Sequence, residues 1–303
     1  MDTRTSLPVL VRRVAIATAA LALLTTPFAS AAEAGITKGF KPKTTVALAP
    51  GVTFKVGTMT TTGGRPQSVR VGIISPRHEG VRLKALLSND KVVKREVVTK
   101  IALGKARPGF KPMIATNGDM SKRNRVDAYA APHSMAVSGG ELMVAQACAR
   151  PTLGVDAEGN VAVNNVRAHV SATPPGHKYP TVIHKVNTNR DGGHIVLFTK
   201  RFASSTQTAY GGVEVILDLE DKLRANGEQQ VRVLKVRKGG GNTKLRAGQA
   251  VLSTKNPKHK WVYRLKVGQR FPLYTEVVRS TGKPCSTTMP PAPGFDDIME
   301  AQG

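Results

Sequence analysis

The sequence predicts an α+β domain dominated by strands, in which a mixed sheet is accompanied by few helices. Three observations predict this class. Apolar and polar residues alternate with a period of two in many short segments, a pattern typical of half-buried strands. Glycine-rich turn signals separate these segments, and only one longer stretch carries its apolar residues at helical spacing. The chain of 303 residues is long enough for one large domain or two small ones with a buried core.

The first 31 residues have the three-part order of a cleavable export signal. Arg12 and Arg13 precede an apolar run from Val14 to Leu24, and Ala29-Ser30-Ala31 supplies small residues for a signal peptidase. The run is shorter than the ~20 apolar residues that a membrane-spanning helix needs. We therefore expect cleavage near Ala31, no membrane span after cleavage, and a protein that is secreted or associated with the cell envelope. The paired arginines leave the export route, general secretory or twin-arginine, open.

The next part of the chain, residues 32–64, is expected to form a short basic leader, to about residue 43, followed by the first strands. The main domain is expected to occupy 65–303. Three alternating segments predict the early strands, at residues 52–56, 69–73 and 81–85.

One helix is predicted from Asp90, which can cap it, to Gly104. Its apolar residues Val93, Val97 and Ile101 lie at helical spacing. A short buried strand at 111–116 is expected to follow and to end at Asn117-Gly118-Asp119.

Further strands are predicted beyond this point, at residues 134–137, 141–146, 161–170, 180–185, 194–199, 212–218, 230–237, 249–253, 261–266 and 271–278. The triple glycine at 239–241 is predicted to be a hairpin turn, because no phosphate-binding Gly-x-x-x-x-Gly-Lys-Ser/Thr motif surrounds it. Residues 283–303 are rich in proline and predict no closing strand or helix.

The charge balance points to anionic partners. The chain has 45 Lys and Arg against 20 Asp and Glu, a net charge of +25. Such an excess attracts polyanions. After export we expect a phosphorylated glycan or another anionic envelope polymer as the partner rather than nucleic acid, and aromatic residues, at 5%, are too few for an RNA-stacking surface.

Cys148 and Cys285 favour a disulfide in an oxidising compartment, and two isolated thiols are the alternative. Neither cysteine has zinc-finger spacing, the histidines occur singly, and no His-Glu-x-x-His motif or EF-hand loop is present. The sequence therefore predicts no metal and no cofactor.

Candidate site residues lie in two polar segments at predicted strand ends and at one position inside a predicted strand. The segments are Asn117-Gly118-Asp119 and 187–191, with Asn189 and Arg190, and the single position is Glu214. The alternatives are a simple turn, a hairpin and a solvated strand face.

The order of segments resembles the phosphodiester glycosidase family, whose bacterial relatives are often labelled exopolysaccharide-biosynthesis proteins. The resemblance covers roughly 65–278 and rests on residues 115–119, 137–142, 151–159, 187–190, 197–199, Thr206, 212–215, 250–253 and 265–268. It implies hydrolysis of a sugar-1-phosphodiester, with Asp119 and Glu214 as the catalytic carboxylates and Arg190 on the phosphate. Asn117 would bind sugar hydroxyls, and Gly118 and Asn189 would complete the substrate site. Whether the product retains its configuration is left open, as is the oligomeric state.

The chain also departs from the family pattern. Met120-Ser121 stands where the family has aromatic residues, and the family's Arg-Thr, Asp-Gly-Arg and Asp-Gly-Gly-Gly-Ser segments have no counterpart. The resemblance therefore implies the N-terminal portion of such a domain, with a C-terminally incomplete sheet and no turnover by this chain alone. A non-catalytic protein that binds anionic envelope polymers is the alternative, and a fragment without a function of its own is a third.

Overall fold

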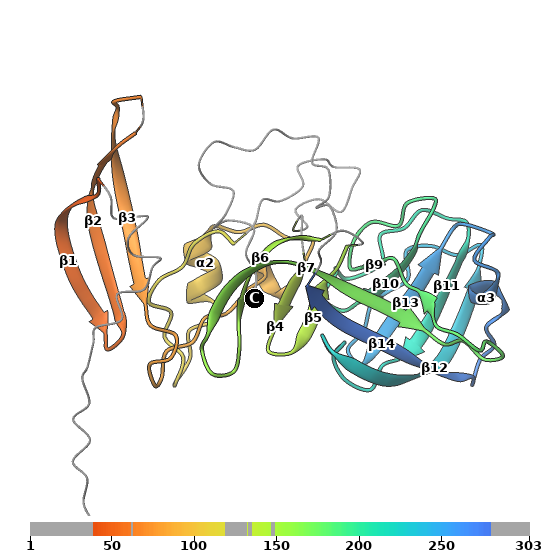
Figure 1. Cartoon of the computed structure of the whole chain (residues 1–303). Helices are drawn as coiled ribbons and strands as arrows, with labels where there is room; N and C mark the ends of the chain where they lie inside the picture. The colour runs from red at the N-terminus through yellow and green to blue at the C-terminus, as the bar shows by residue number, and fades with distance from the viewer. Residues whose placement is uncertain (1–38, 62, 119–131, 133–134, 147–148, 280–303) are drawn as a thin grey trace, which may run out of the picture. The chain divides into compact units, whose positions relative to one another are not determined.

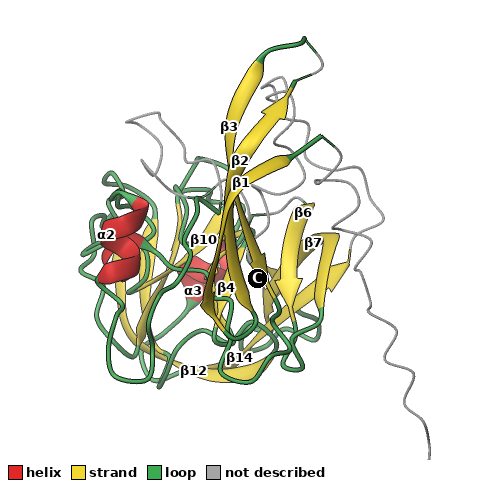
Figure 2. Cartoon of the chain, turned by 90° about the vertical axis from the view of Figure 1, so that its left-hand side faces the viewer, coloured by secondary structure: helices red, strands yellow, loops and turns green. Residues whose placement is uncertain are grey.

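The structure of the chain, a computed structural model, describes residues 39–61, 63–118, 132, 135–146 and 149–279. It divides into two compact units, Met1–Thr44 with Val56–Arg70 and Thr45–Lys55 with Val71–Gly303. Strands dominate the described residues and the helices are short (Figure 2). The strand-dominated α+β class predicted from the sequence is confirmed. The predicted signal peptide lies outside the described residues.

An N-terminal sheet of three strands has the order β1-β2-β3 (Figure 1). It consists of β1 (Lys41–Ala49), β2 (Val52–Thr60) and β3 (Pro66–Ile74). The alternation at 52–56 and 69–73 correctly predicted β2 and β3. The leader was predicted too long, because β1 already begins at Lys41 and eight of its nine residues are exposed.

The largest sheet has nine strands in the order β6-β7-β14-β12-β11-β13-β10-β9, with β8 paired to β7. The strands are β6 (Arg150–Val155), β7 (Val161–Ala172), β8 (Thr181–Val182), β9 (Lys185–Val186), β10 (Ile195–Thr199), β11 (Val213–Asp218), β12 (Gly227–Lys238), β13 (Gln249–Thr254) and β14 (Arg270–Arg279). β9 and β10 are parallel and the other pairs are antiparallel, so the sheet is mixed, as predicted. A separate pair is formed by β4 (Ala136–Ser138) and β5 (Glu141–Val144).

Strand β11 lies inside this sheet, between β12 and β13. Its odd-numbered residues Val213, Val215 and Leu217 are buried in the larger apolar cluster. Successive side chains of a strand point to opposite faces, so Glu214 and Ile216 face the other side, where Ile216 packs on a second cluster that includes Val196, Phe198 and Val251. Glu214 therefore belongs to an interior face of the sheet.

The triple glycine is not the hairpin turn that the sequence predicted. Because β11 separates β12 from β13, the segment after Lys238 must cross the end of β11 to reach β13. We call residues 239–248 the crossover loop. Gly241 allows this path, since a Cβ atom there would lie 2.5 Å from the carbonyl oxygen of Ala209.

The predicted helix from Asp90 to Gly104 is largely wrong. Only η1 (Ser88–Asp90), a turn of 3-10 helix, and α2 (Val98–Leu103) form there. Between them, the backbone N–H groups of Val92 and Val93 donate to the carbonyls of Arg201 and Phe202, at 2.7 and 3.1 Å. These bonds to a distant segment replace the helical ones, and Val97 is left 69% exposed.

Three predicted strands are also wrong. Residues 81–85 and 111–116 are irregular, and Met113 is exposed. Residues 261–266 instead enter α3 (Lys260–Arg264), because Trp261 and Leu265, one helical turn apart, are both buried in the larger cluster. Among the described residues, no helix is both long enough and apolar enough to span a membrane.

Candidate functional site

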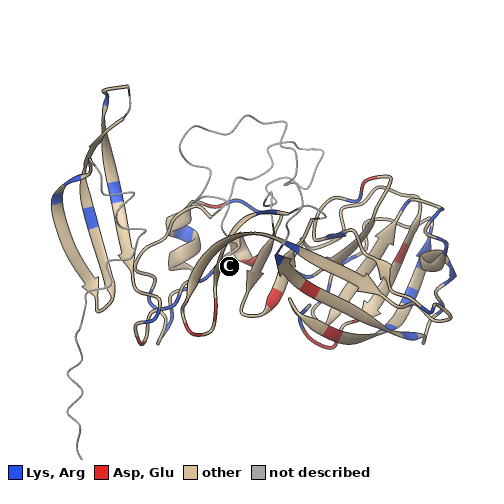
Figure 3. Ribbon diagram, in the orientation of Figure 1, with Lys and Arg blue, Asp and Glu red and all other residues tan. Residues whose placement is uncertain are grey.

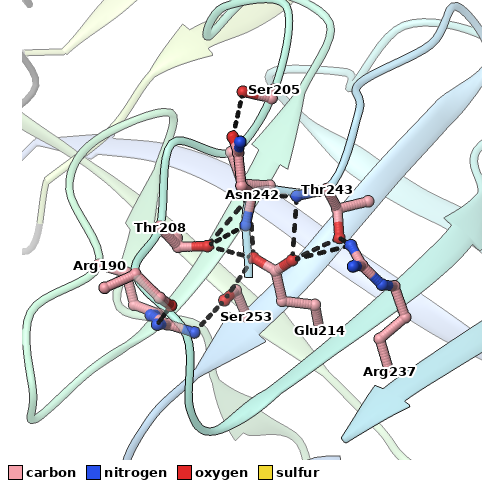
Figure 4. A network of polar contacts seen from close by, with 10 residues as sticks. Arg190, Ser205, Thr208, Glu214, Arg237, Asn242, Thr243 and Ser253 are labelled. Carbon is pink, nitrogen blue, oxygen red and sulfur yellow. Dashed lines mark hydrogen bonds and ion pairs between the residues drawn. The ribbon is translucent and has the colours of Figure 1, made fainter. Parts of the chain in front are cut away.

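Glu214 is the centre of a buried polar network. Its side chain is fully buried on β11, next to Arg237 of β12 and Ser253 of β13 in the strand register. Figure 4 shows the carboxylate between Arg190 and Arg237, with the crossover loop above it. Burial of a carboxylate costs several kcal/mol unless it is hydrogen-bonded and paired with positive charge.

Both oxygens of Glu214 are saturated by donors. Oε1 accepts from the hydroxyls of Thr208 at 2.7 Å, Thr206 at 2.9 Å and Ser253 at 3.3 Å. Oε2 accepts from the hydroxyl of Thr243 and from its backbone N–H at 3.2 Å. A carboxylate offers about four lone-pair sites, so these five bonds leave no free acceptor for a substrate.

Two threonines before β11, Thr206 and Thr208, link Glu214 to the crossover loop. The Thr206 hydroxyl accepts from the backbone N–H of Thr243 at 2.9 Å, and the Thr208 hydroxyl accepts from that of Asn242 at 3.0 Å. The two hydroxyls lie 3.1 Å apart, and each is also within hydrogen-bond distance of Oε1 of Glu214. The network binds the crossover loop to the 204–208 segment and across the end of β11.

These contacts determine the charge of Glu214. Burial alone would raise its pKa, but the hydrogen bonds from three threonine hydroxyls and the positive charge of Arg190 lower it below the ordinary value. Glu214 is therefore ionised at neutral pH. With a low pKa and no free lone pair, it suits electrostatic positioning better than proton donation.

Arg190 and Arg237 flank the carboxylate. The Arg237 guanidinium lies 3.8 Å from Oε2 and donates to the Thr243 hydroxyl. Arg190 donates to the Ser253 hydroxyl at 3.2 Å and to the carbonyl of Ala209 at 2.6 Å. Ser253 thus links Arg190 to Glu214, so two of the residues predicted from sequence are joined.

Arg190 keeps both its positive charge and unused hydrogen-bond donors. It is half-buried, its pKa is lowered by burial while the charge of Glu214 opposes the change, and a guanidinium stays protonated at physiological pH. The two bonds above use two of its five N–H groups. With two arginines and one carboxylate, the network has a net positive charge.

The other residues predicted from the sequence lie partly outside and partly inside the described part of the chain. Asp119, Cys148 and Cys285 lie outside the described residues. Asn117 and Gly118 belong to the irregular segment that ends at residue 118, and neither contributes to the Glu214 network. Asn189, next to Arg190, is partly buried.

Asn187, predicted only as part of a polar segment, is a structural residue. It is fully buried with φ +51°, its Nδ2 donates at 2.8 Å to the Met143 carbonyl and to the Thr199 hydroxyl, and its Oδ1 accepts from the Thr199 N–H at 2.7 Å. It thereby connects β5 to the end of β10.

Sequence reasoning missed three partners of Glu214: Thr208, Thr243 and Arg237. The two threonines lie in loops, and Arg237 ends a predicted strand without any local signal that it faces a carboxylate. It also missed that His184, His194 and His259 come together, with ring centroids 4.9 and 5.4 Å apart. In the part of the chain that the structure describes, no group of three or more His, Cys, Asp and Glu is arranged to hold a metal ion.

Comparisons with known proteins show similarity of fold alone. No protein-family model matches the chain, and no curated protein sequence matches it. The structure is similar to a hypothetical protein from Synechocystis, with a TM-score of 0.61 and 14% identity over 78% of this chain and 41% of that one. It is also similar to a putative exported protein from Burkholderia pseudomallei, with a TM-score of 0.51 and 16% identity over 72% of this chain and 47% of that one. The chain thus spans less than half the length of either.

Proposed function

We propose that the protein is an exported phosphodiester glycosidase-like protein that binds the phosphate of sugar-1-phosphodiester linkages in glycans or cell-envelope polymers. The observation that carries the proposal is the attachment of Arg190 to the Glu214 network through Ser253. A half-buried guanidinium fixed before the ligand arrives loses little freedom on binding, and its fork of donors matches a phosphate. Export is supported by the N-terminal pattern and by the label of the Burkholderia neighbour.

In this proposal Glu214 is a positioning residue. Its ionised carboxylate holds the hydroxyl of Ser253, which in turn orients Arg190. Fixed charges of this kind stabilise charge that develops in a reaction because they need no reorganisation.

The reaction would break the bond between the anomeric carbon and the phosphate oxygen. Water adds to that carbon, its proton passes to a base, and the phosphate monoester leaves with the bonding electron pair. We assign proton transfer to Asp119 from the family resemblance, and we place Asn117, Gly118 and Asn189 at the sugar. Because three polar segments of the family have no counterpart in this sequence, we expect this chain to bind the diester without releasing sugar.

A second candidate function is non-catalytic binding of anionic envelope polymers, and one observation favours it. No Asp or Glu occurs between Glu228 and Glu276, whereas this stretch holds 12 Lys and Arg residues. It runs from β12 through the crossover loop and α3 to β14 (Figure 3). An uninterrupted run of positive charge attracts polyanions without requiring a shaped site.

Calorimetric titration separates the two functions. The probes are a methyl diester of a sugar 1-phosphate, the uncharged sugar, and a poly(glycerol phosphate), each tested between about 50 and 200 mM salt. The proposed function predicts one diester per chain, tighter than the free sugar by at least about tenfold, with a modest salt slope because one phosphate is neutralised. Polymer binding alone, with an affinity that falls about a thousandfold or more over this salt range and no binding of the diester, would support the second function instead.

A turnover assay accompanies the titration. Phosphorus NMR of the diester with this chain should show binding but no phosphomonoester. If a monoester does form, Asp119→Asn should lower its rate by about a hundredfold or more, and an unchanged rate would remove Asp119 from the site.

A further inference from the structure

Three histidines form a cluster beside the segment that carries Arg190. His184 precedes β9, His194 precedes β10 and His259 precedes α3, yet the His184 ring contacts both of the others, at centroid distances of 4.9 and 5.4 Å. They contribute nothing to the Glu214 network, so the proposed function does not account for them.

Each ring has one nitrogen whose role is fixed by its partner. The backbone N–H of Ile195 donates to Nδ1 of His184 at 3.1 Å, so this nitrogen is an acceptor and the ring proton lies on Nε2. Nε2 of His259 donates to the carbonyl of Gly193 at 3.0 Å. Nδ1 of His194 donates to the Asp191 carboxylate at 2.7 Å.

Protonation therefore affects the three rings differently. His194 and His259 can each take a second proton on the opposite nitrogen and keep their present hydrogen bonds. His184 must take it on Nδ1, because Nε2 already carries one. Its bond with Ile195 is then lost, since two donors face each other.

The charges around His184 influence how readily its ring takes up the second proton. Lys185 of β9, His194 and His259 disfavour a positive charge on the His184 ring, and the carboxylate of Asp191 favours it. Burial alone would raise the pKa of Asp191, but hydrogen bonds from Lys185 and His194 lower it to about 2, so it stays ionised in mild acid. Burial, and then the charges of His194 and His259, lower the pKa of His184.

The bond that would break lies at one end of the Arg190 segment. His184 and Ile195 are joined twice, because the His184 N–H also donates to the Ile195 carbonyl at 3.0 Å. Together with the parallel pairing of β9 with β10, these bonds close the loop that contains Arg190 and Asp191. The same loop is held at its centre by the ion pairs of Asp191 with Lys185 and His194.

We propose that His184 is an acid-sensitive latch: neutral, its ring holds the Ile195 N–H at the start of β10, and protonated, it gives up this bond while the pairing of β9 with β10 remains. The inference does not depend on the proposed function, because it concerns the backbone of the loop and not a ligand.

Amide hydrogen exchange read by NMR tests the latch. In the wild-type chain, the protection factor of the Ile195 amide, corrected for the intrinsic effect of pH, should fall between pH 7.5 and 4.5, by about tenfold for each pH unit below the pKa of His184, because the neutral form is depleted tenfold per unit. The Val215 amide, in the centre of the sheet, should keep its protection and so exclude global unfolding.

Two variants make the test specific. His184→Asn places a non-titrating amide oxygen near the position of Nδ1, and the Ile195 protection should then change less than about twofold over the same pH range. His259→Asn removes a neighbouring positive charge but keeps His184, so the fall should persist with its midpoint at higher pH. An Ile195 protection that does not fall in the wild type, or that falls equally in His184→Asn, overturns the proposal.

Discussion

Thr243 donates both its backbone N–H and its hydroxyl to the same carboxylate oxygen of Glu214, from 29 positions further along the chain. This double contact fastens the crossover loop to the strand it passes over. It also explains how a fully buried carboxylate persists inside a sheet, since the hydrogen bonds and the two flanking arginines offset its desolvation.

Replacing Glu214 should destabilise the protein strongly. In Glu214→Gln the amide group faces hydroxyl and N–H donors, and the positive charges of Arg190 and Arg237 lose their balance. We expect a loss of about 3 kcal/mol in the free energy of unfolding, measured with urea. The matched control is Asp218→Asn on the same strand, whose pair with Arg232 is partly exposed and should cost less than about 1 kcal/mol. Equal losses would show that the network is not structural.

The stability should also depend on pH through Glu214. Its pKa is lower in the folded protein than in the unfolded chain, so its contribution is complete above the unfolded value of about 4.3 and is lost as the pH falls through the folded value. Urea unfolding between pH 6 and pH 2.5 should therefore show falling stability in the wild type. The decline should be shallower in Glu214→Gln, and parallel curves would contradict the assignment.

Asn187→Ala should cost about 2 to 4 kcal/mol. The substitution leaves the Thr199 N–H and the Met143 carbonyl buried without a partner and places alanine at φ +51°. Thermal unfolding checks this, with the exposed Asn165→Ala on β7 as the control. A change within about 0.5 kcal/mol, typical of surface sites, would refute the role given to Asn187.

Two glycines should differ although both have positive φ. Gly212→Ala, at φ +82°, would place a Cβ atom 2.2 Å from the Thr254 carbonyl oxygen, whereas Gly239→Ala, at φ +69°, would meet open space. Both variants share the backbone strain of about 1 kcal/mol. The additional loss in the free energy of unfolding of Gly212→Ala, compared with Gly239→Ala, therefore measures the clash. If the two variants unfold at the same urea concentration, the close approach of β11 and β13 at Gly212 is wrong.

The sequence predicted the strands of the main sheet best where apolar residues alternate, as at Val213, Val215 and Leu217. It failed where tertiary bonds override local pattern. Val92 and Val93 use their N–H groups on distant carbonyls, which no helical stripe reveals. Trp261 and Leu265 fit either a strand or a helix until their burial is known.

The candidate site was predicted only in pieces. Arg190 and Glu214 could be identified singly, but their connection depends on Ser253 and on the place of β13 between β10 and β11. Thr208 and Thr243 meet Glu214 because the crossover loop passes the end of β11. Local sequence does not encode this feature of the topology.

The affinity of Arg190 variants for a sugar-1-phosphate methyl diester tests the central claim most directly. Calorimetric titration at fixed salt should show binding weakened about 10- to 100-fold in Arg190→Gln, and weakened in Arg190→Lys as well, because an ammonium group cannot reproduce the bidentate fork. The control Arg246→Gln removes one exposed charge from the basic stretch and should change the affinity less than about threefold. Equal losses in Arg190→Gln and Arg246→Gln, or no loss in either, would contradict a phosphate site at Arg190.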